Sequence, residues 1–136
     1  MMLVKSKTGQ SKIHGVGLFA DEFIIKGTKV WEYTPWFDFS LTKGQVEKLS
    51  DAAKEQFLNY AYLSKETDKY VLCSDDARFF NHQKDPNIIC KVPENPEFED
   101  ALECFAVQDI MKGEELTCDY SEFEADFSEI LKNDRK

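Results

Sequence analysis

Short extended segments separated by glycine and polar turns set the strongest limit on how this chain can fold. Three of them occupy the N-terminal third and read MLVKSK, GLFADE and KVWEYT. Three more follow in the second half and read KYVLCS, NIICKVP and ALECFAVQDI. Segments of this length, rich in β-branched and aromatic residues and bounded by turn residues, are typical of strands. We therefore expect a mostly β fold with several small sheets.

The stretch between these two groups has helical spacing. Thr42 and Gln45 stand at the two ends of a capping box, in which each side chain serves a backbone N–H of the first helical turn. The apolar residues that follow recur at intervals of three and four: Val46, Leu49, Ala53, Phe57 and Tyr60. This spacing predicts one amphipathic helix over about residues 42–61.

The acidic C-terminal segment, residues 121–136, also carries apolar residues on one helical face: Phe123, Phe127, Ile130 and Leu131. The pattern predicts a C-terminal helix laid against the body of the protein. A chain of 136 residues without an internal repeat or a low-complexity linker is expected to form one domain, residues 1–136.

The composition excludes some classes of partner. No window approaches the roughly 20 apolar residues of a membrane span, so we expect a soluble protein that does not bind a membrane. The net charge of -9 comes from 26 acidic and 17 basic residues, so direct binding to nucleic acid is not expected. A basic peptide would be attracted, although the acidity has an equally good explanation in solubility alone.

Four cysteines stand singly in apolar, strand-like surroundings: Cys73, Cys90, Cys104 and Cys118. They form no C-x-x-C pair and have no flanking histidine cluster, which argues against a structural zinc site, and no metal is expected. We expect buried free thiols in a reducing compartment, with disulfides as the less favoured alternative.

Three motifs carry candidate chemistry. The first, HGVGLF at residues 14–19, has two glycines around one residue, which would let a ligand approach the backbone closely, although a Gly-x-Gly is more often only a turn. The second, RFFNHQKDPN at residues 78–87, offers the amide of Asn81 and the ring of His82 as ligand contacts. Its alternative is that Asn81, His82, Pro86 and Asn87 satisfy buried backbone groups where chains cross tightly.

The third motif, GEELTCDY at residues 113–120, ends in Tyr120. A phenol can orient or polarise a reacting nitrogen, but a lone tyrosine at a strand end is usually a packing residue.

In this order, GVG, RFFNHQKDPN and GEELTCDY resemble the three motifs of the SET-domain protein lysine methyltransferases. The resemblance runs over about residues 4–123 and implies a β-clip, or SET, fold. In that fold the second and third motifs form a knot-like crossing beside the cofactor pocket and the substrate channel. The absence of flanking cysteine-rich zinc segments makes the chain similar to the compact viral and bacterial members.

The resemblance also implies roles for individual residues. The backbone of the first motif would contact the methionine part of S-adenosylmethionine through His14, Gly15, Val16, Gly17 and Leu18. Asn81 and His82 would hold the adenine and the amino-acid end, and Phe123 would stack near the adenine. Tyr120 matches the active-site tyrosine. The C-terminal tail would close the cofactor pocket and the peptide groove in place of a zinc-bound segment.

The implied reaction transfers a methyl group to the ε-amine of a lysine and leaves S-adenosylhomocysteine. The amine must lose its proton, and lowering its pKa from about 10.4 to about 7 requires about 4–5 kcal/mol. A narrow apolar channel and a neighbouring sulfonium charge both disfavour the ammonium form. Tyr120 is therefore expected to orient the amine rather than to accept its proton.

Two positions depart from the family pattern. Gln83 replaces a common serine, and a side chain of that size is expected to be tolerated at the surface. Cys118 occupies a channel position that is often Phe or Tyr and that is linked to the number of methyl groups added. A smaller wall favours di- or trimethylation. Cys90 is a further candidate for the channel, with a plain core cysteine as the alternative.

An active enzyme is the favoured interpretation, and a catalytically weak or inactive module that binds a basic peptide is the alternative. The expected partner is a basic, lysine-containing protein such as a histone-like substrate. The location is expected to be intracellular, in the cytoplasm of a bacterium or in a host nucleus for a viral or secreted protein. A monomer and a homodimer both remain open. One aromatic-rich run is expected to pack over the core rather than to pair two copies: Trp31, Trp36, Phe37 and Phe39.

Overall fold

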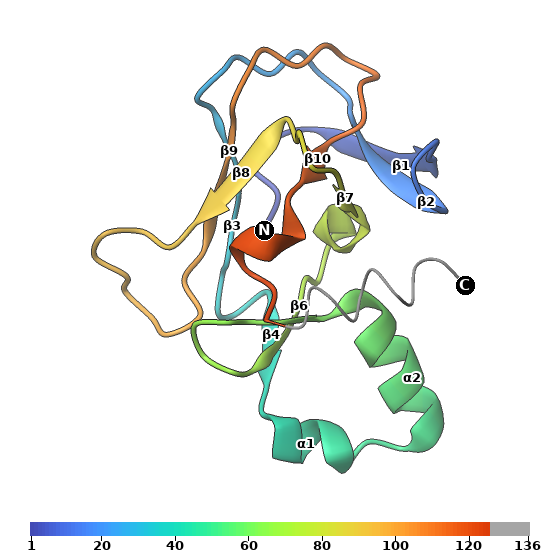
Figure 1. The fold of residues 1–136 in the computed structure, drawn as a ribbon, viewed down its shortest axis with the longest axis vertical. Coiled ribbons are helices and arrows are strands. Elements are labelled where there is room, and N and C mark those ends of the chain that lie inside the picture. Colours follow the sequence, from blue (N-terminus) through green and yellow to red (C-terminus); the bar gives the residue numbers. More distant parts are fainter. Residues whose placement is uncertain (126–136) are drawn as a thin grey trace.

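A computed structural model describes residues 1–125, in which ten short strands form three small sheets (Figure 1). A two-stranded sheet contains β1 (Ser6–Gln10) and β2 (Val16–Ala20). A three-stranded sheet has the order β4 (Phe39–Leu41), β6 (Tyr70–Leu72), β5 (Tyr62–Leu63). A five-stranded sheet has the order β3 (Lys29–Glu32), β9 (Glu103–Ala106), β8 (Ile88–Lys91), β10 (Thr117–Cys118), β7 (Asn81–His82). The expectation of a mostly β fold with several small sheets is confirmed.

The C-terminal strand β10 lies between two earlier strands and runs parallel to both of them. Cys118 pairs with His82 of β7 on one side and with Ile88 of β8 on the other. Residues 83–87 connect β7 to β8, so the chain near its end passes through the bend that this connection makes (Figure 1). This arrangement is the expected knot-like crossing.

The side chain of Asn87 holds this crossing together. Its Nδ2 donates to the carbonyl oxygen of Glu115 at 2.8 Å, and its Oδ1 accepts from the backbone N–H of Thr117 at 2.9 Å. The amide thus bonds to β10 as a neighbouring strand would, and it satisfies backbone groups that would otherwise be buried without partners. The suggestion that Asn87 serves backbone groups at a crossing is confirmed.

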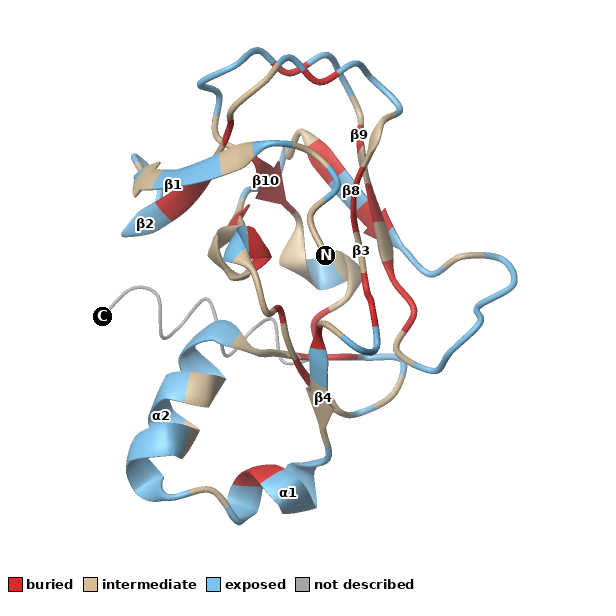
Figure 2. Ribbon diagram, turned by 180° about the vertical axis from the view of Figure 1, so that it is seen from behind, coloured by how far each residue is buried: buried red, intermediate tan, exposed pale blue. Residues whose placement is uncertain are grey.

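The core lies between the β1–β2 hairpin and the five-stranded sheet (Figure 2). Its large side chains with no more than 2% exposure include Leu18, Ile24, Ile88, Ile110 and Leu116. In β8, Ile88 and Cys90 are buried while Ile89 is exposed, the alternation that marks a strand with one face on a core.

The predicted helix over residues 42–61 is two helices, α1 (Lys43–Glu47) and α2 (Asp51–Tyr60). The capping box of Thr42 and Gln45 is present and begins α1. Ser50 begins a second helix, because its hydroxyl accepts a hydrogen bond from the N–H of Ala53 at 3.2 Å. No residue of α2 is buried, so the apolar spacing did not mark a core-facing stripe (Figure 2).

The predicted C-terminal helix falls mainly outside the described residues. Phe123 comes directly after a short 3-10 helix, Tyr120–Glu122. Phe127, Ile130 and Leu131 lie beyond residue 125. Within residues 1–125, neither α1 nor α2 is long and apolar enough to cross a membrane.

The expectation of four free thiols is wrong for two of the cysteines. Cys90 of β8 and Cys104 of β9 lie opposite each other in the antiparallel pairing and form a disulfide. Cys73 and Cys118 are free and buried. Spacing along the chain could not reveal the pair, because only the strand register brings these two positions together. Among residues 1–125, no group of three or more His, Cys, Asp or Glu side chains could hold a metal ion.

The expected packing of the aromatic-rich run over the core is only partly correct. Trp31 is buried, but Trp36 is 80% exposed and Phe39 is 57% exposed. Gln83 is exposed, as expected for a surface side chain.

The disulfide should contribute measurably to stability. Its cysteines are 14 positions apart, and closing a loop of about 15 residues stabilises a folded chain by about 3 kcal/mol. We expect the double variant Cys90→Ala/Cys104→Ala to lose about that much free energy of unfolding in a guanidinium titration. Adding a reductant should destabilise the wild type but leave the variant unchanged. Four reactive thiols in the unfolded, unreduced wild type, instead of two, would contradict the assignment.

Candidate functional site

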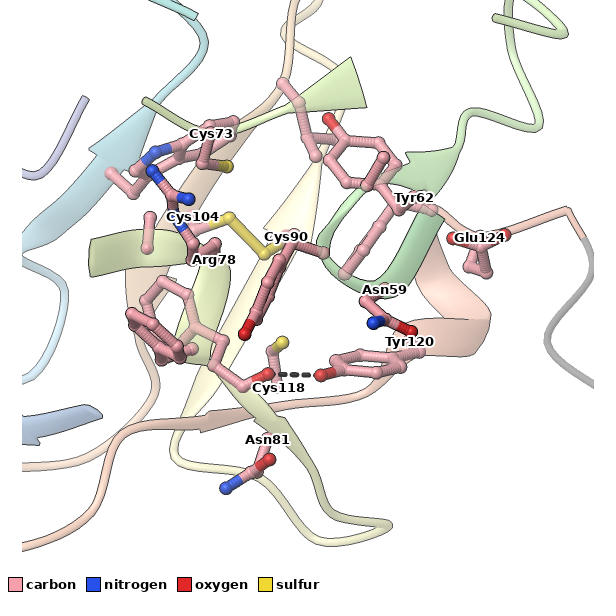
Figure 3. Close-up of a pocket in the computed structure, with 18 of the residues that line it drawn as sticks. Asn59, Tyr62, Cys73, Arg78, Asn81, Cys90, Cys104, Cys118, Tyr120 and Glu124 are labelled. Carbon is pink, nitrogen blue, oxygen red and sulfur yellow. Dashed lines mark hydrogen bonds between the residues drawn. A yellow bond between two sulfur atoms is a disulfide. The ribbon is translucent and has the colours of Figure 1, made fainter. Parts of the chain in front are cut away.

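A cavity of about 390 Å³ lies beside the crossing of β10 with β7 and β8 (Figure 3). This volume is within the range of small-molecule sites. Residues from all three sequence motifs line it: His14, Val16, Asn81, Cys118 and Tyr120, with Phe123 just beyond the last motif. The fold therefore brings residues that are more than 100 positions apart along the chain together around one cavity.

One wall of the cavity is a row of side chains across four neighbouring strands. Trp31 of β3 pairs with Cys104 of β9, and Cys104 pairs with Cys90 of β8. Cys118 of β10 pairs with Ile88, which is two residues from Cys90 and so points to the same face. Both cysteines that were expected in the channel therefore line the cavity, and Cys90 does so as half of a disulfide (Figure 3).

This wall carries no charge. Burial raises the pKa of the Cys118 thiol well above its usual value, and burial likewise raises the pKa of Cys73, which also lines the cavity. Both thiols are therefore neutral near pH 7. Two charged side chains, Arg78 and Glu124, lie elsewhere in the lining, and each bonds to the backbone: Arg78 donates to the carbonyl of Ser74, and Glu124 accepts from the N–H of Leu63.

The indole N–H of Trp31 has no hydrogen-bond partner within residues 1–125, although Trp31 is only 3% exposed. A buried donor without an acceptor costs about 1–3 kcal/mol. Trp31, which also lines the cavity, therefore carries one unsatisfied buried donor.

Glycine is required for a different structural reason at each of the two glycine positions of the first motif. Gly15 has φ +45°, a left-handed conformation that favours glycine. At Gly17, a Cβ would lie 2.3 Å from Oε1 of Glu115, so a carboxylate of the third motif occupies the space that a side chain would fill. The close approach expected of a ligand is thus made at Gly17 by the protein itself.

Asn81 connects the first and third motifs. Its Nδ2 donates to the carbonyl oxygen of His14 at 3.0 Å, to Oε1 of Glu115 at 2.9 Å and, at a longer 3.4 Å, to the carbonyl oxygen of Val16. Because all three neighbours are acceptors, they fix which end of the amide is nitrogen. Within residues 1–125, no protein group donates a hydrogen bond to the amide oxygen of Asn81, which can therefore accept one from a donor such as an ammonium group.

His82 positions the backbone at the tyrosine. Its Nδ1 accepts a hydrogen bond from the N–H of Tyr120 at 3.1 Å and lies 3.8 Å from Oδ1 of Asp119. A neutral ring that accepts at Nδ1 carries its proton on Nε2. His82 therefore acts on the site through the position of Tyr120 and does not itself line the cavity.

The hydroxyl of Tyr120 donates a hydrogen bond to the carbonyl oxygen of Phe80, which holds the phenol at the cavity wall (Figure 3). Phe123 makes an edge contact with Tyr62, at 4.9 Å between ring centroids, and a tilted contact with Tyr120, at 5.8 Å. These rings give the cavity an apolar end near the tyrosine.

Of the residues implied by the resemblance, Gly15, Gly17, Leu18 and His82 do not line the cavity. Leu18 is fully buried in the core. The sequence interpretation did not single out Trp31 as a site residue, nor Glu115 or the Phe80 carbonyl. Glu115 stood inside the third motif, but only the folded chain shows what it contacts.

Trp31 offers a test of the unsatisfied donor. We expect Trp31→Phe to change the free energy of unfolding by about 1 kcal/mol or less, because the ring is largely kept and no hydrogen bond is lost. The control Trp31→Ala should lose about 3–5 kcal/mol by opening a void. Chemical denaturation measures both changes. A loss above about 2 kcal/mol for Trp31→Phe would mean that the N–H already has a partner.

Comparison with known proteins agrees with this geometry. A family model described as the SET domain matches residues 15–121. Histone-lysine N-methyltransferase 2B of Homo sapiens is 32% identical over 111 residues, which covers 82% of this chain and 4% of that protein. The H3 lysine-4 specific histone-lysine N-methyltransferase of Schizosaccharomyces pombe is 31% identical over 122 residues, which covers 82% of this chain and 12% of that protein. The chain thus spans only a small part of the length of these relatives.

A solved structure has the same fold. It is the Polycomb Repressive Complex 2 of Chaetomium thermophilum in an autoinhibited conformation bound to S-adenosylmethionine. The match has a TM-score of 0.66 and 24% identity, and it covers 97% of this chain and 17% of that chain. With the family model matching most of its length and the three motifs meeting at one cavity, this chain belongs to the SET-domain family.

Proposed function

We propose that this protein transfers methyl groups from S-adenosylmethionine to the ε-amine of lysine in a protein substrate. The observation that carries the proposal is one cavity where Asn81, Cys118 and the hydrogen-bonded hydroxyl of Tyr120 meet. Relatives named histone-lysine N-methyltransferases support this class of reaction.

The residues around the cavity fit this cofactor. Its volume of about 390 Å³ suits a ligand of nucleoside size. Asn81 lines the cavity, and its amide oxygen, which the three acceptors around the nitrogen leave unused, is a suitable partner for the ammonium of an amino-acid moiety. S-adenosylmethionine, when bound, supplies an electrophilic methyl group on a sulfonium. The neighbouring backbone at His14 and Val16 would hold the same end.

The wall of the cavity favours a neutral lysine amine. Desolvation disfavours the charged form of an amine, and the row formed by Trp31, Cys104, Cys90 and Cys118 offers no carboxylate to compensate it. The guanidinium of Arg78, elsewhere in the lining, acts in the same direction by like-charge repulsion, and the opposing carboxylate of Glu124 already accepts from the N–H of Leu63 with both oxygens. No strong base at the site is then needed.

Tyr120 is suited to orient the amine. Its proton is directed to the carbonyl of Phe80, so its oxygen can accept a hydrogen bond from an entering N–H. The carbonyl of Phe80 is fixed by the same bond and provides a second acceptor close by. Alignment of the amine in a water-poor space is the largest effect that these groups can supply.

The direct test is methyl transfer itself. A panel of histones and other basic proteins, incubated with this protein and S-adenosylmethionine, should gain one, two or three methyl groups on lysine by mass spectrometry. We expect Tyr120→Phe to lower the rate about a hundredfold or more, because the orienting hydroxyl is lost. Cofactor binding by calorimetry without transfer to any protein would favour the alternative, a module that binds a basic peptide without turnover.

The size of Cys118 should set the product. A small side chain at this wall leaves room around a methylated amine, so we expect di- and trimethyl-lysine from the wild type. Cys118→Phe should lower the ratio of tri- to monomethyl product about tenfold or more, as crowding by a few methylenes can do in a closed pocket. Cys118→Ser, which keeps the size, should preserve the product mixture. Equal product ratios for the Phe and Ser variants would contradict this role.

The partner is proposed to be a basic protein. A net charge of -9 attracts lysine- and arginine-rich segments and repels nucleic acid. Because basic proteins such as histones occur inside cells, we also propose an intracellular location.

A further inference from the structure

Glu115 joins three segments at the end of the cavity where Asn81 lies. The hydroxyl of Ser11 lies 2.8 and 2.9 Å from its two carboxylate oxygens and donates to them. Nδ2 of Asn81 donates to Oε1 at 2.9 Å. The carboxylate thus accepts hydrogen bonds both from the loop that precedes β2 and from β7.

Ser11 passes this restraint on to the loop that precedes β2. Its hydroxyl oxygen accepts from the backbone N–H of Ile13 at 2.9 Å and from that of His14 at 3.2 Å. Its own N–H donates to the carbonyl of Gly15 at 2.8 Å, which closes the loop. The conformation of residues 11–15 therefore depends on the hydroxyl of Ser11, which is fixed by its hydrogen bond to the carboxylate of Glu115.

Asn81 receives the second restraint. Three acceptors surround its amide nitrogen, and the carboxylate of Glu115 is the only charged one, so it makes the strongest of these bonds. Without that charge the amide is less strongly held with its nitrogen toward the loop. Glu115, which does not line the cavity, therefore sets the orientation of the amide of Asn81, which does.

The space at Gly17 shows how closely the parts fit. A Cβ at this position would lie 2.3 Å from Oε1 and 2.9 Å from Cδ of Glu115, and 3.0 Å from Cβ of Ser11. The glycine does not have a positive φ. Its missing side chain is therefore explained by the carboxylate and not by the backbone conformation.

We propose that Glu115 is a positioning residue for the cofactor end of the site. It does not line the cavity. It holds the loop of residues 11–17 and the amide of Asn81 in the arrangement that presents the backbone of His14 and Val16 and the oxygen of Asn81 to the ligand. The ligand named here, S-adenosylmethionine or its product, rests on the proposed function.

The first test needs no ligand. Gly17→Ala should lower the Tm of the wild type by about 5 °C or more, because its methyl group meets the carboxylate. In a Glu115→Ala background the same change should cost much less, although the contact with Ser11 remains. Equal losses in both backgrounds would overturn the proposal, since the double-mutant cycle would then show no coupling. If Glu115→Ala fails to fold, Glu115→Asp replaces it: the shorter side chain withdraws the carboxylate from Gly17, so Gly17→Ala should again cost less than in the wild type.

The second test measures affinity for S-adenosylhomocysteine by calorimetry. Glu115→Ala should raise the Kd about tenfold or more, as expected for the loss of charge-assisted hydrogen bonds. Glu115→Gln, which keeps an oxygen for Asn81, should lie between this variant and the wild type. In turnover, Glu115→Ala should raise KM for S-adenosylmethionine more than it lowers kcat.

Glu114→Ala is the matched control, because Glu114 is the exposed neighbour in the same motif and carries the same charge. Its Kd should stay within about twofold of the wild type. Unchanged affinity in Glu115→Ala would overturn the proposal while leaving the proposed function intact. A wild type that does not bind S-adenosylhomocysteine would instead refute the proposed cofactor, and the coupling between Gly17 and Glu115 would still decide whether Glu115 holds the loop.

Discussion

The pairing of β10 with both β7 and β8 is the constraint on which the rest of the site depends. Cys118 of β10 has a partner on both sides, so β10 must lie inside the five-stranded sheet, between β8 and the edge strand β7. Asn87 supplies the bonds that a longer strand would make. Once β10 is fixed in this place, Cys118 faces the cavity, Tyr120 follows at its rim, and Glu115 comes within reach of Asn81 and Gly17.

The same constraint separates two kinds of environment in a small space. Toward the first motif the cavity offers fixed hydrogen-bonding groups, because Asn81 and Glu115 hold the loop backbone in place. Across the sheet it offers an indole, a disulfide and a neutral thiol. A polar end that can hold a charged cofactor and a wall that disfavours an ammonium group are the two conditions that methyl transfer to an amine requires. The tyrosine stands between them.

The sequence predicted much of this molecule, and the failures have physical causes. Strand-like segments and three ordered motifs predicted the mostly β fold and the crossing, because local patterns and their order carry that information. The single helix predicted over residues 42–61 was wrong because α1 ends at Glu47 and Ser50 caps a second helix. The disulfide was missed because register, and not spacing, brings Cys90 to Cys104. Glu115 was missed because its role depends on contacts with residues more than 30 positions away.

The most direct measurement is a crystal structure of the protein with S-adenosylhomocysteine. Our account predicts density for the ligand inside the cavity beside β10, with its amino-acid end at His14, Val16 and the oxygen of Asn81. Its sulfur should face the hydroxyl of Tyr120 and the side chain of Cys118. A ligand bound elsewhere, or an empty cavity at saturating ligand, would contradict the assignment of this cavity as the methyl-transfer site.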